Sequence, residues 1–237
     1  MISNNPKLGG HLPGSLFEMP VLQDVIVEGV GLTGSLPSEI CHAAQLSKLY
    51  VSGNQITGSL PKCITHLANM TEFSAASNLI EGTLPNLLHK MTSLVKLDLR
   101  SNYISGTLPH ALGDMSRQLE VAKLDLNRLS CDLPHSVLNW KGTPHKKNLA
   151  LLTGNLFSCP PTSGFNAIFG PALDDELPLH DLDEAGSTYQ CGMQAWYSPL
   201  VQSGIVVLAL TCAAQASNPA WSIALYAKRI WVKPAPE

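Results

Sequence analysis

Short stretches in which apolar and polar residues alternate recur at a fixed interval along the first two thirds of the chain. In the clearest copy, Leu97 and Leu99 alternate with Lys96, Asp98 and Arg100. An alternation of period two predicts a short β-strand with one buried face, so the leucines should point inward and the polar residues outward. The apolar positions of the successive copies are Leu46, Leu49 and Val51; Met70, Phe73 and Ala75; Leu94, Leu97 and Leu99; Leu119, Ala122 and Leu124.

A repeating unit surrounds each of these stretches. Leu-Pro pairs begin at positions 12, 36, 60, 84, 108 and 133, which gives successive spacings of 24, 24, 24, 24 and 25 residues. A glycine stands two residues before the leucine in the first five copies, and an asparagine stands six residues before it at Asn54, Asn78, Asn102 and Asn127. One unit of this size cannot bury its apolar side alone, so the units are expected to stack into a solenoid.

The recurring polar and turn residues have distinct expected roles. The asparagine amide is expected to satisfy backbone groups at the bend after each strand, including those of the adjacent coil. The glycine permits backbone angles that side chains disfavour, and the proline fixes φ and turns the chain away from the strand. A second apolar set is expected to line the return path: Ile40, Ala43, Ile64, Leu67, Leu88, Met91, Leu112 and Met115.

The pattern L-x-x-L-x-L-x-x-N-x-L-[ST]-G-x-[LI]-P, as it stands at 94–109, closely resembles the leucine-rich repeat in the form common in plant receptors. The resemblance covers roughly residues 5–160. It implies an α/β repeat solenoid that is curved, with a parallel β-sheet on the concave side and an irregular or 3-10 helical convex side. Solenoids of this kind use the concave surface for binding.

A few positions depart from the repeat. Val30 occupies the asparagine position of the first full copy, and Cys131 occupies the glycine position of the last good one, which suggests looser turns there. In the final copy, Leu149, Leu151 and Leu152 do not all fit inward positions of one strand, so its phase stays open.

The six cysteines show no closely spaced pairs of the kind that bind zinc. The run 154–160, followed by Tyr-Gln-Cys-Gly at 189–192, resembles the closing segment of membrane-anchored repeat proteins in protists and algae. Cys159 and Cys191 are the best candidates for a disulfide that staples this cap. Cys41 and Cys63 lie on the return paths of adjacent coils, and a second disulfide or two free thiols remain equally open.

The end of the chain is uncharged over residues 200–227, which is longer than the approximately 20 residues that a membrane helix needs. Aromatic residues flank this stretch, and Lys228, Arg229 and Lys233 follow it, so the positive-inside rule places the C-terminus in the cytosol. The expected organisation is therefore a solenoid at 1–160, a capping and juxtamembrane segment at 161–198, a C-terminal transmembrane helix at 199–227 and a cytoplasmic tail at 228–237. Gln215 and Pro219 weaken the apolar run, and the alternative is a tail packed on the solenoid.

Composition excludes several classes of function. The formal net charge is −3 and only 14% of residues are charged, so the electrostatic basis for nucleic-acid binding is missing. Common catalytic signatures are absent from the sequence, and no cofactor or metal site is expected. Stacked histidine pairs at positions 42 and 66 and at 110 and 135 are expected to be solvated side chains.

The outward strand positions are the candidate ligand-binding residues. They carry both signs of charge and one aromatic ring, which suits a protein or peptide ligand better than a polyanion. The charged and aromatic members are Asp24, Glu28, Lys48, Tyr50, Glu72, Lys96, Asp98, Arg100, Lys123 and Asp125. Outward Asp98 is expected to behave as an ordinary surface residue.

We predict a non-enzymatic protein- or peptide-binding module of a single-pass, receptor-like or adhesive cell-surface protein, with the repeats outside the cell. No apolar leader opens the chain, so such a protein would need a signal sequence upstream. Asn69 heads the glycosylation sequon Asn-Met-Thr. The alternatives are a secreted binder or inhibitor and the truncated ectodomain of a receptor kinase.

Overall fold

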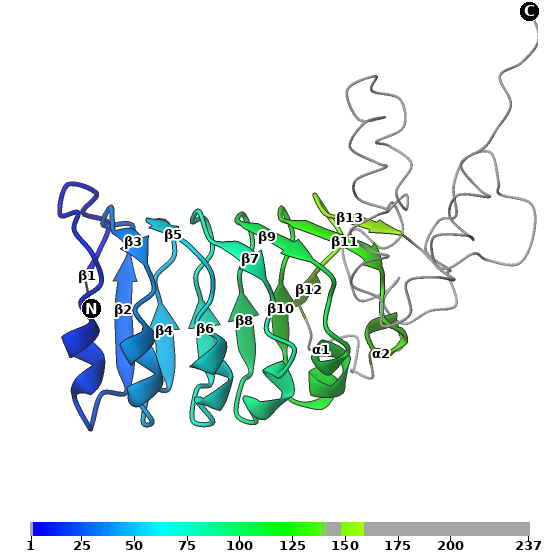
Figure 1. The fold of residues 1–237 in the computed structure, drawn as a ribbon, viewed down its shortest axis with the longest axis horizontal. Helices are drawn as coiled ribbons and strands as arrows, with labels where there is room; N and C mark the ends of the chain where they lie inside the picture. The colour runs from blue at the N-terminus through cyan, green and yellow to red at the C-terminus, as the bar shows by residue number, and fades with distance from the viewer. Residues whose placement is uncertain (1, 139, 141–147, 159–237) are drawn as a thin grey trace, which may run out of the picture.

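Stacked coils form a solenoid in the computed structural model (Figure 1), which describes residues 2–138, 140 and 148–158. A seven-stranded parallel sheet runs along one side of the solenoid in the order β1-β2-β4-β6-β8-β10-β12. Its strands are β1 (Ile2–Ser3), β2 (Asp24–Glu28), β4 (Lys48–Tyr50), β6 (Glu72–Ser74), β8 (Lys96–Asp98), β10 (Val121–Lys123) and β12 (Asn148–Ala150). This sheet confirms the expected repeat solenoid.

The register of this sheet follows the sequence repeat. Leu49 pairs with Phe73, Phe73 with Leu97 and Leu97 with Ala122, so equivalent positions of successive coils lie side by side. Side chains therefore form rows along the solenoid axis, with neighbours about 4.8 Å apart.

A second set of short parallel strands was not expected from the sequence. It comprises the pair β3 (Thr33–Ser35) and β5 (Gln55–Thr57), and the four strands β7 (Glu81–Thr83), β9 (Tyr103–Gly106), β11 (Arg128–Asp132) and β13 (Leu156–Ser158). Thr33 pairs here with Gln55, two residues before its repeat equivalent Thr57. These strands are therefore staggered relative to the repeat, whereas those of the first sheet are not.

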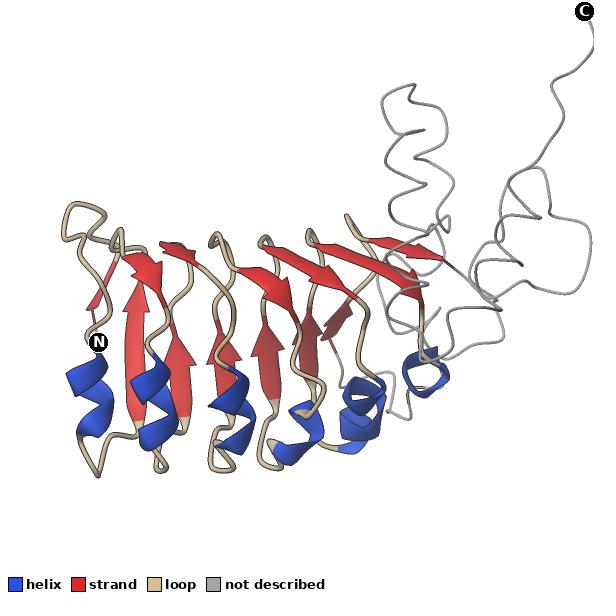
Figure 2. Cartoon of the chain, in the orientation of Figure 1, coloured by secondary structure: helices blue, strands red, loops and turns tan. Residues whose placement is uncertain are grey.

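Short helices return the chain to the next strand (Figure 2). They are the 3-10 helices η1 (Gly14–Glu18), η2 (Ser38–His42), η3 (Lys62–His66), η4 (Leu88–Lys90) and η5 (Met115–Arg117), and the α-helices α1 (His110–Asp114) and α2 (His135–Leu138). A proline precedes several of them, because its fixed φ suits the entry to a helix and its missing N–H would have no partner there. The expected 3-10 convex side is confirmed.

Apolar side chains fill the space between the strands and helices. All four predicted strand triplets and all eight predicted return-path residues are buried, with at most 3% of any of these side chains exposed. Leu149, Leu151 and Leu152 are also all buried. Because β12 ends at Ala150, the bend that follows frees Leu151 and Leu152 from strand alternation, which resolves the open phase of the last coil.

Cys41 and Cys63 are joined by a disulfide, with their Cα atoms 5.8 Å apart. They belong to η2 and η3 on adjacent coils, so the repeat brings them together. The predicted bridge between Cys159 and Cys191 lies outside the described residues, as do the capping segment, the proposed membrane helix and the cytoplasmic tail. Within the described part of the chain, no helix has the length and apolar character needed to cross a membrane.

Candidate binding face

Three rows of outward side chains cross the seven-stranded sheet, and we call this surface the concave face. The first row runs Asp24, Lys48, Glu72, Lys96, Val121, and the second runs Ile26, Tyr50, Ser74, Asp98, Lys123. A third row continues from Glu28, the last residue of β2, through residues that lie just past the other strands: Ser52, Ala76, Arg100 and Asp125. Backbone bonds such as Gly29 N–H to Ser52 O (3.0 Å) and Ser77 N–H to Arg100 O (2.9 Å) extend the parallel ladder there. The ten predicted ligand residues thus share one surface.

Tyr50 lies at the centre of a polar cluster on this face. Its hydroxyl donates to Glu72 Oε2, and Lys48 Nζ lies 3.0 Å from Glu72 Oε1. Lys96 Nζ lies over the Tyr50 ring, 4.9 Å from its centroid. These contacts cross three neighbouring coils, so they fix the orientation of the tyrosine ring.

The cluster shifts the acidity of its members. Burial, followed by the hydrogen bond to Glu72, raises the pKa of the Tyr50 hydroxyl. The same hydrogen bond lowers the pKa of Glu72 despite its partial burial, and the contact with Glu72 raises the pKa of Lys48. At neutral pH these shifts favour a neutral phenol at Tyr50, a carboxylate at Glu72 and an ammonium group at Lys48.

Asp98 corrects the expectation that every outward position is ordinary surface, because only 5% of the residue is exposed. Its Oδ1 accepts from the Arg100 backbone N–H at 3.4 Å and lies 3.5 Å from Arg100 Nε. The neighbouring Asp125 has one carboxylate oxygen that is shielded from solvent and has no hydrogen-bond partner among the residues that the structure describes. Burial of this carboxyl raises the pKa of Asp125.

A shallow groove of about 540 Å³ follows the third row. Five of its lining residues are small, and we call them the floor: Gly29, Ser52, Gly53, Ser74 and Ala76. Charged and aromatic residues also line the groove: Glu28, Tyr50, Lys96, Asp98 and Arg100. Sequence reasoning missed Gly29, Gly53, Asn4 and Ser77. Ser52, Ser74 and Ala76 are at outward positions expected from the repeat but were not among the candidate ligand residues, because small side chains give no signal of charge or hydrophobicity.

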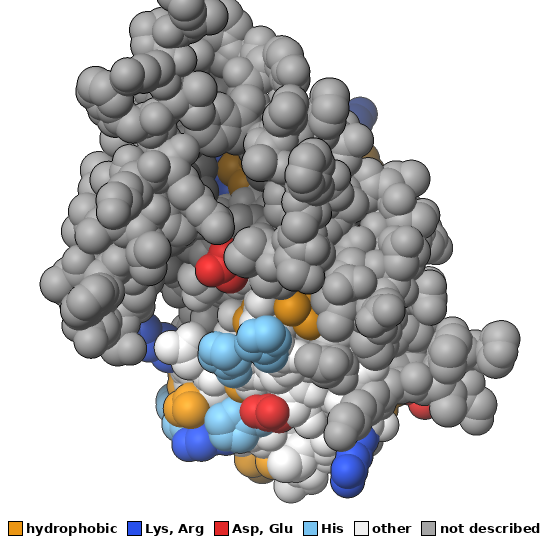
Figure 3. All heavy atoms as spheres, turned by 90° about the vertical axis from the view of Figure 1, so that its right-hand side faces the viewer, with side chains coloured by type: hydrophobic (Ala, Val, Ile, Leu, Met, Phe, Trp, Pro, Cys, Tyr) orange, Lys and Arg blue, Asp and Glu red, His pale blue; other side chains and the backbone are white. Residues whose placement is uncertain are grey.

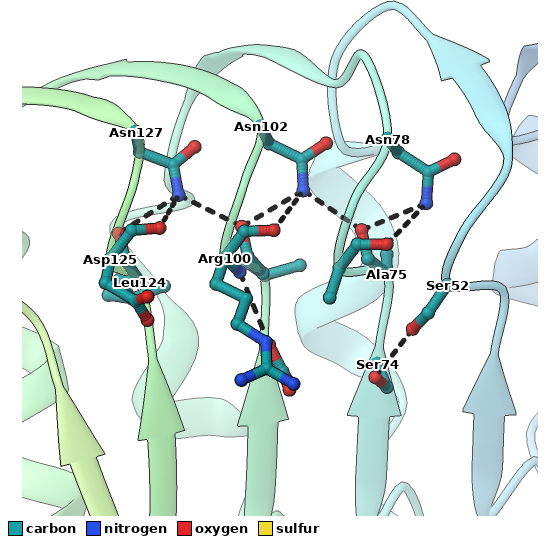
Figure 4. Close-up of polar contacts among 12 residues, drawn as sticks. Ser52, Ser74, Ala75, Asn78, Arg100, Asn102, Leu124, Asp125 and Asn127 are labelled. Carbon is teal, nitrogen blue, oxygen red and sulfur yellow. Dashed lines mark hydrogen bonds and ion pairs between the residues drawn. The ribbon is translucent and has the colours of Figure 1, made fainter. Parts of the chain in front are cut away.

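A ladder of buried asparagines holds the strand ends that carry this groove (Figure 4). Asn102 Nδ2 donates to the carbonyls of Ala75 and Leu99, each at 3.0 Å, and Asn102 Oδ1 accepts from the Ile80 N–H at 3.0 Å. Asn78 and Asn127 make equivalent contacts. The predicted role of the asparagine in joining adjacent coils is confirmed.

The remaining candidate residues, the histidines and Asn69, lie elsewhere on the described surface. Histidine side chains gather on the end of the solenoid shown in Figure 3. His42, His66, His110 and His135 are all exposed. No three histidine, cysteine, aspartate or glutamate side chains are grouped to hold a metal among residues 2–138, 140 and 148–158. Asn69, in the turn after η3, is exposed, and its Nδ2 donates to the Ala44 carbonyl at 2.9 Å.

Comparisons with known proteins agree with this architecture. The family model described as Leucine Rich Repeat matches residues 45–67 and 93–115. A search of curated proteins found no match. The ectodomain of the plant membrane receptor kinase GASSHO1/SCHENGEN3 from Arabidopsis thaliana, solved in complex with Casparian strip integrity factor 2, is 29% identical with a TM-score of 0.59. That match covers 63% of this chain and 17% of the receptor chain.

Two further structures are similar over about the same region. PEPR1, solved with AtPEP1, is 25% identical with a TM-score of 0.57, over 68% of this chain and 21% of that one. A plant ice-binding protein shares the fold at 20% identity and a TM-score of 0.58, over 67% of this chain and 57% of that one. This chain therefore spans only a fraction of the length of the structures it matches. The repeat period, the asparagine ladder and these matches show that the chain contains leucine-rich repeats, stacked in a solenoid that resembles plant receptor ectodomains.

Proposed function

We propose that this solenoid is a non-enzymatic module that binds a protein or peptide on its concave face. The main support is the groove, whose lining combines charges of both signs and an aromatic ring with a set of small residues. Solved structures with this fold include the plant peptide hormone receptor RGFR1 in complex with RGF2. Charged and polar groups at defined positions in an accessible groove favour a ligand whose charges are complementary to them.

The binding proposal is tested by selecting peptides from a random display library on the whole chain. Tyr50→Ala removes the aromatic ring at the centre of the face, and we expect it to weaken selected peptides at least about fivefold, because aromatic anchors dominate interfaces. Lys62→Ala is the matched control, since Lys62 is exposed on η3 away from the face. Peptides that respond to the control and ignore Tyr50→Ala would contradict the proposal.

We further propose that the module belongs to a single-pass cell-surface protein of the receptor-like or adhesive kind. The uncharged stretch 199–227 and the basic residues that follow it support this topology. Behind a signal peptide, we expect glycosylation of Asn69, which is exposed in the fold, and none at a sequon engineered on an extension past Glu237. Modification of both sites would instead favour a secreted binder. The similarity to receptor kinase ectodomains keeps a truncated receptor kinase ectodomain as the other candidate.

A further inference from the structure

The charges around the groove are separated along its length. Glu28 lies on the N-terminal side of the floor, whereas Lys96 and Arg100 lie three coils further along. Three strand spacings of about 4.8 Å place Glu28 and Arg100 about 14 Å apart along the solenoid axis. The floor between them contributes no charge. One end of the groove therefore carries the acid Glu28, and the other carries two bases together with the buried acid Asp98.

Both end groups are available to a ligand. Among the described residues, no hydrogen bond or ion pair engages the Glu28 carboxylate. Asp98 Oδ1 contacts the backbone N–H and the Nε atom of Arg100. In the described part of the chain, no hydrogen bond or ion pair engages the two terminal guanidinium nitrogens of Arg100, so they are available to another partner. Because Asp98 is buried and fixed in the sheet, this contact also orients the arginine. A planar guanidinium held in this way suits a carboxylate.

The floor sets the shape of the ligand. Gly29 and Gly53 have positive φ values of 64° and 68°, and the Cβ positions that they lack face the preceding coil, at Asn4 and Gly29 respectively. The other floor residues, Ser52, Ser74 and Ala76, add only small side chains. A second main chain can therefore approach closely, and the Tyr50 ring offers a flat surface beside it. An extended peptide rises about 3.3 Å per residue, so about four residues span the distance between the charged ends.

We propose that the groove binds an extended peptide segment with a cationic and an anionic side chain four residues apart, the cation at Glu28 and the anion at Arg100. This inference rests on the proposed binding function and specifies its ligand. Residues separated by four along an extended chain point to the same side, so both charged side chains face the groove. The two ligand charges sum to zero, which also fits a face that carries charges of both signs.

A capped heptapeptide with lysine at its second position, aspartate at its sixth and glycine or serine elsewhere is the test ligand. Its affinity for the whole chain is measured by NMR titration, with the amide signals of Gly29 and Gly53 as reporters. We expect Glu28→Gln and Arg100→Gln each to weaken this peptide about threefold to fivefold, the range for partly exposed ion pairs. Arg100→Lys should restore part of the loss, because it keeps the charge.

A double-mutant cycle assigns each charge to its partner. Replacing the peptide lysine with glutamine should abolish the effect of Glu28→Gln and leave that of Arg100→Gln intact. Replacing the aspartate with asparagine should do the reverse. A peptide whose charges are only two residues apart should bind no better than these singly charged peptides. Glu81→Gln and Arg117→Gln neutralise exposed charges outside the groove and serve as matched controls.

Equal coupling of both peptide charges to both residues, or no coupling at all, would overturn the inference. Its failure is distinguishable from failure of the binding proposal. If Tyr50→Ala weakens the binding of library peptides but Glu28→Gln and Arg100→Gln do not, the binding proposal holds and only the proposed ligand class is refuted. If no library peptide binds the chain, the binding proposal and the proposed ligand class are both refuted.

Discussion

Asn102→Ala deletes one member of the asparagine ladder. The side chain is 5% exposed, and its Oδ1 is the acceptor for the Ile80 N–H at 3.0 Å. Its Nδ2 group donates to the carbonyls of Ala75, Leu99 and Arg100. Alanine offers neither an acceptor nor a donor, so the substitution breaks contacts to its own coil and to the preceding one.

The loss of stability depends on which backbone groups are left without any hydrogen-bond partner. The Ala75 and Leu99 carbonyls keep a second donor, from Asn78 at 3.1 Å and Asn127 at 3.0 Å. The Ile80 N–H has no other acceptor among the described residues, and an unsatisfied buried donor costs about 1–3 kcal/mol. With the loss of the amide's own hydrogen bonds, we expect Asn102→Ala to lower the free energy of unfolding by about 2–4 kcal/mol.

Asn102→Asp separates the acceptor role from the donor role. An aspartate can still accept from the Ile80 N–H, but its charged form places a negative oxygen against two carbonyls. The native state should therefore favour the protonated acid and raise the pKa of this carboxyl above its unfolded value. Hence we expect the loss of stability to be large at neutral pH and to shrink as the pH falls through that raised pKa.

Urea denaturation of the whole chain, followed by circular dichroism, measures these effects from the midpoint and slope of the transition. Asn69→Ala is the matched control, because Asn69 is exposed and makes one hydrogen bond, to Ala44. It should cost less than about 0.5 kcal/mol, as is usual at such surface sites. If Asn102→Ala costs no more than this control, the ladder does not stabilise the stack and the reasoning is refuted.

Three other expectations follow from the packing. Leu97→Ala should cost about 2–5 kcal/mol in the same assay, whereas Leu79→Ala, at a 40% exposed position, should cost far less, and equal losses would refute the strand register. Replacing both Cys41 and Cys63 with serine should lower stability by about 3 kcal/mol, the effect of opening a loop of this size, and peptide mapping without reduction should find the two joined. Asp125→Asn should stabilise the chain at neutral pH but not below the unfolded pKa, because burial raises the folded pKa of Asp125 and the ionised form is the costly one; a stability difference that does not grow as the pH rises would contradict this.

The sequence by itself determined the stacking and the inward positions. Its 24-residue period places equivalent residues of successive coils side by side, so the buried triplets, the asparagine ladder and the rows of the concave face could all be read from the alignment of one repeat on the next. The pairing of Lys48 with Glu72 is an example, since both occupy the same repeat position. A stacked repeat converts sequence period directly into spatial neighbours.

Only the tertiary structure decided the contacts between positions that are not equivalent. Tyr50 contacts Glu72 and Lys96 of the neighbouring row, and the buried Asp98 contacts Arg100. The repeat pattern does not specify how far a long side chain extends from its own row into the next. The stagger of the second set of strands was also decided only in the folded chain, since Thr33 pairs with Gln55 instead of Thr57 and the repeat pattern does not specify this offset. Small residues gain their role in the groove from what surrounds them, and that arrangement exists only once the coils are stacked.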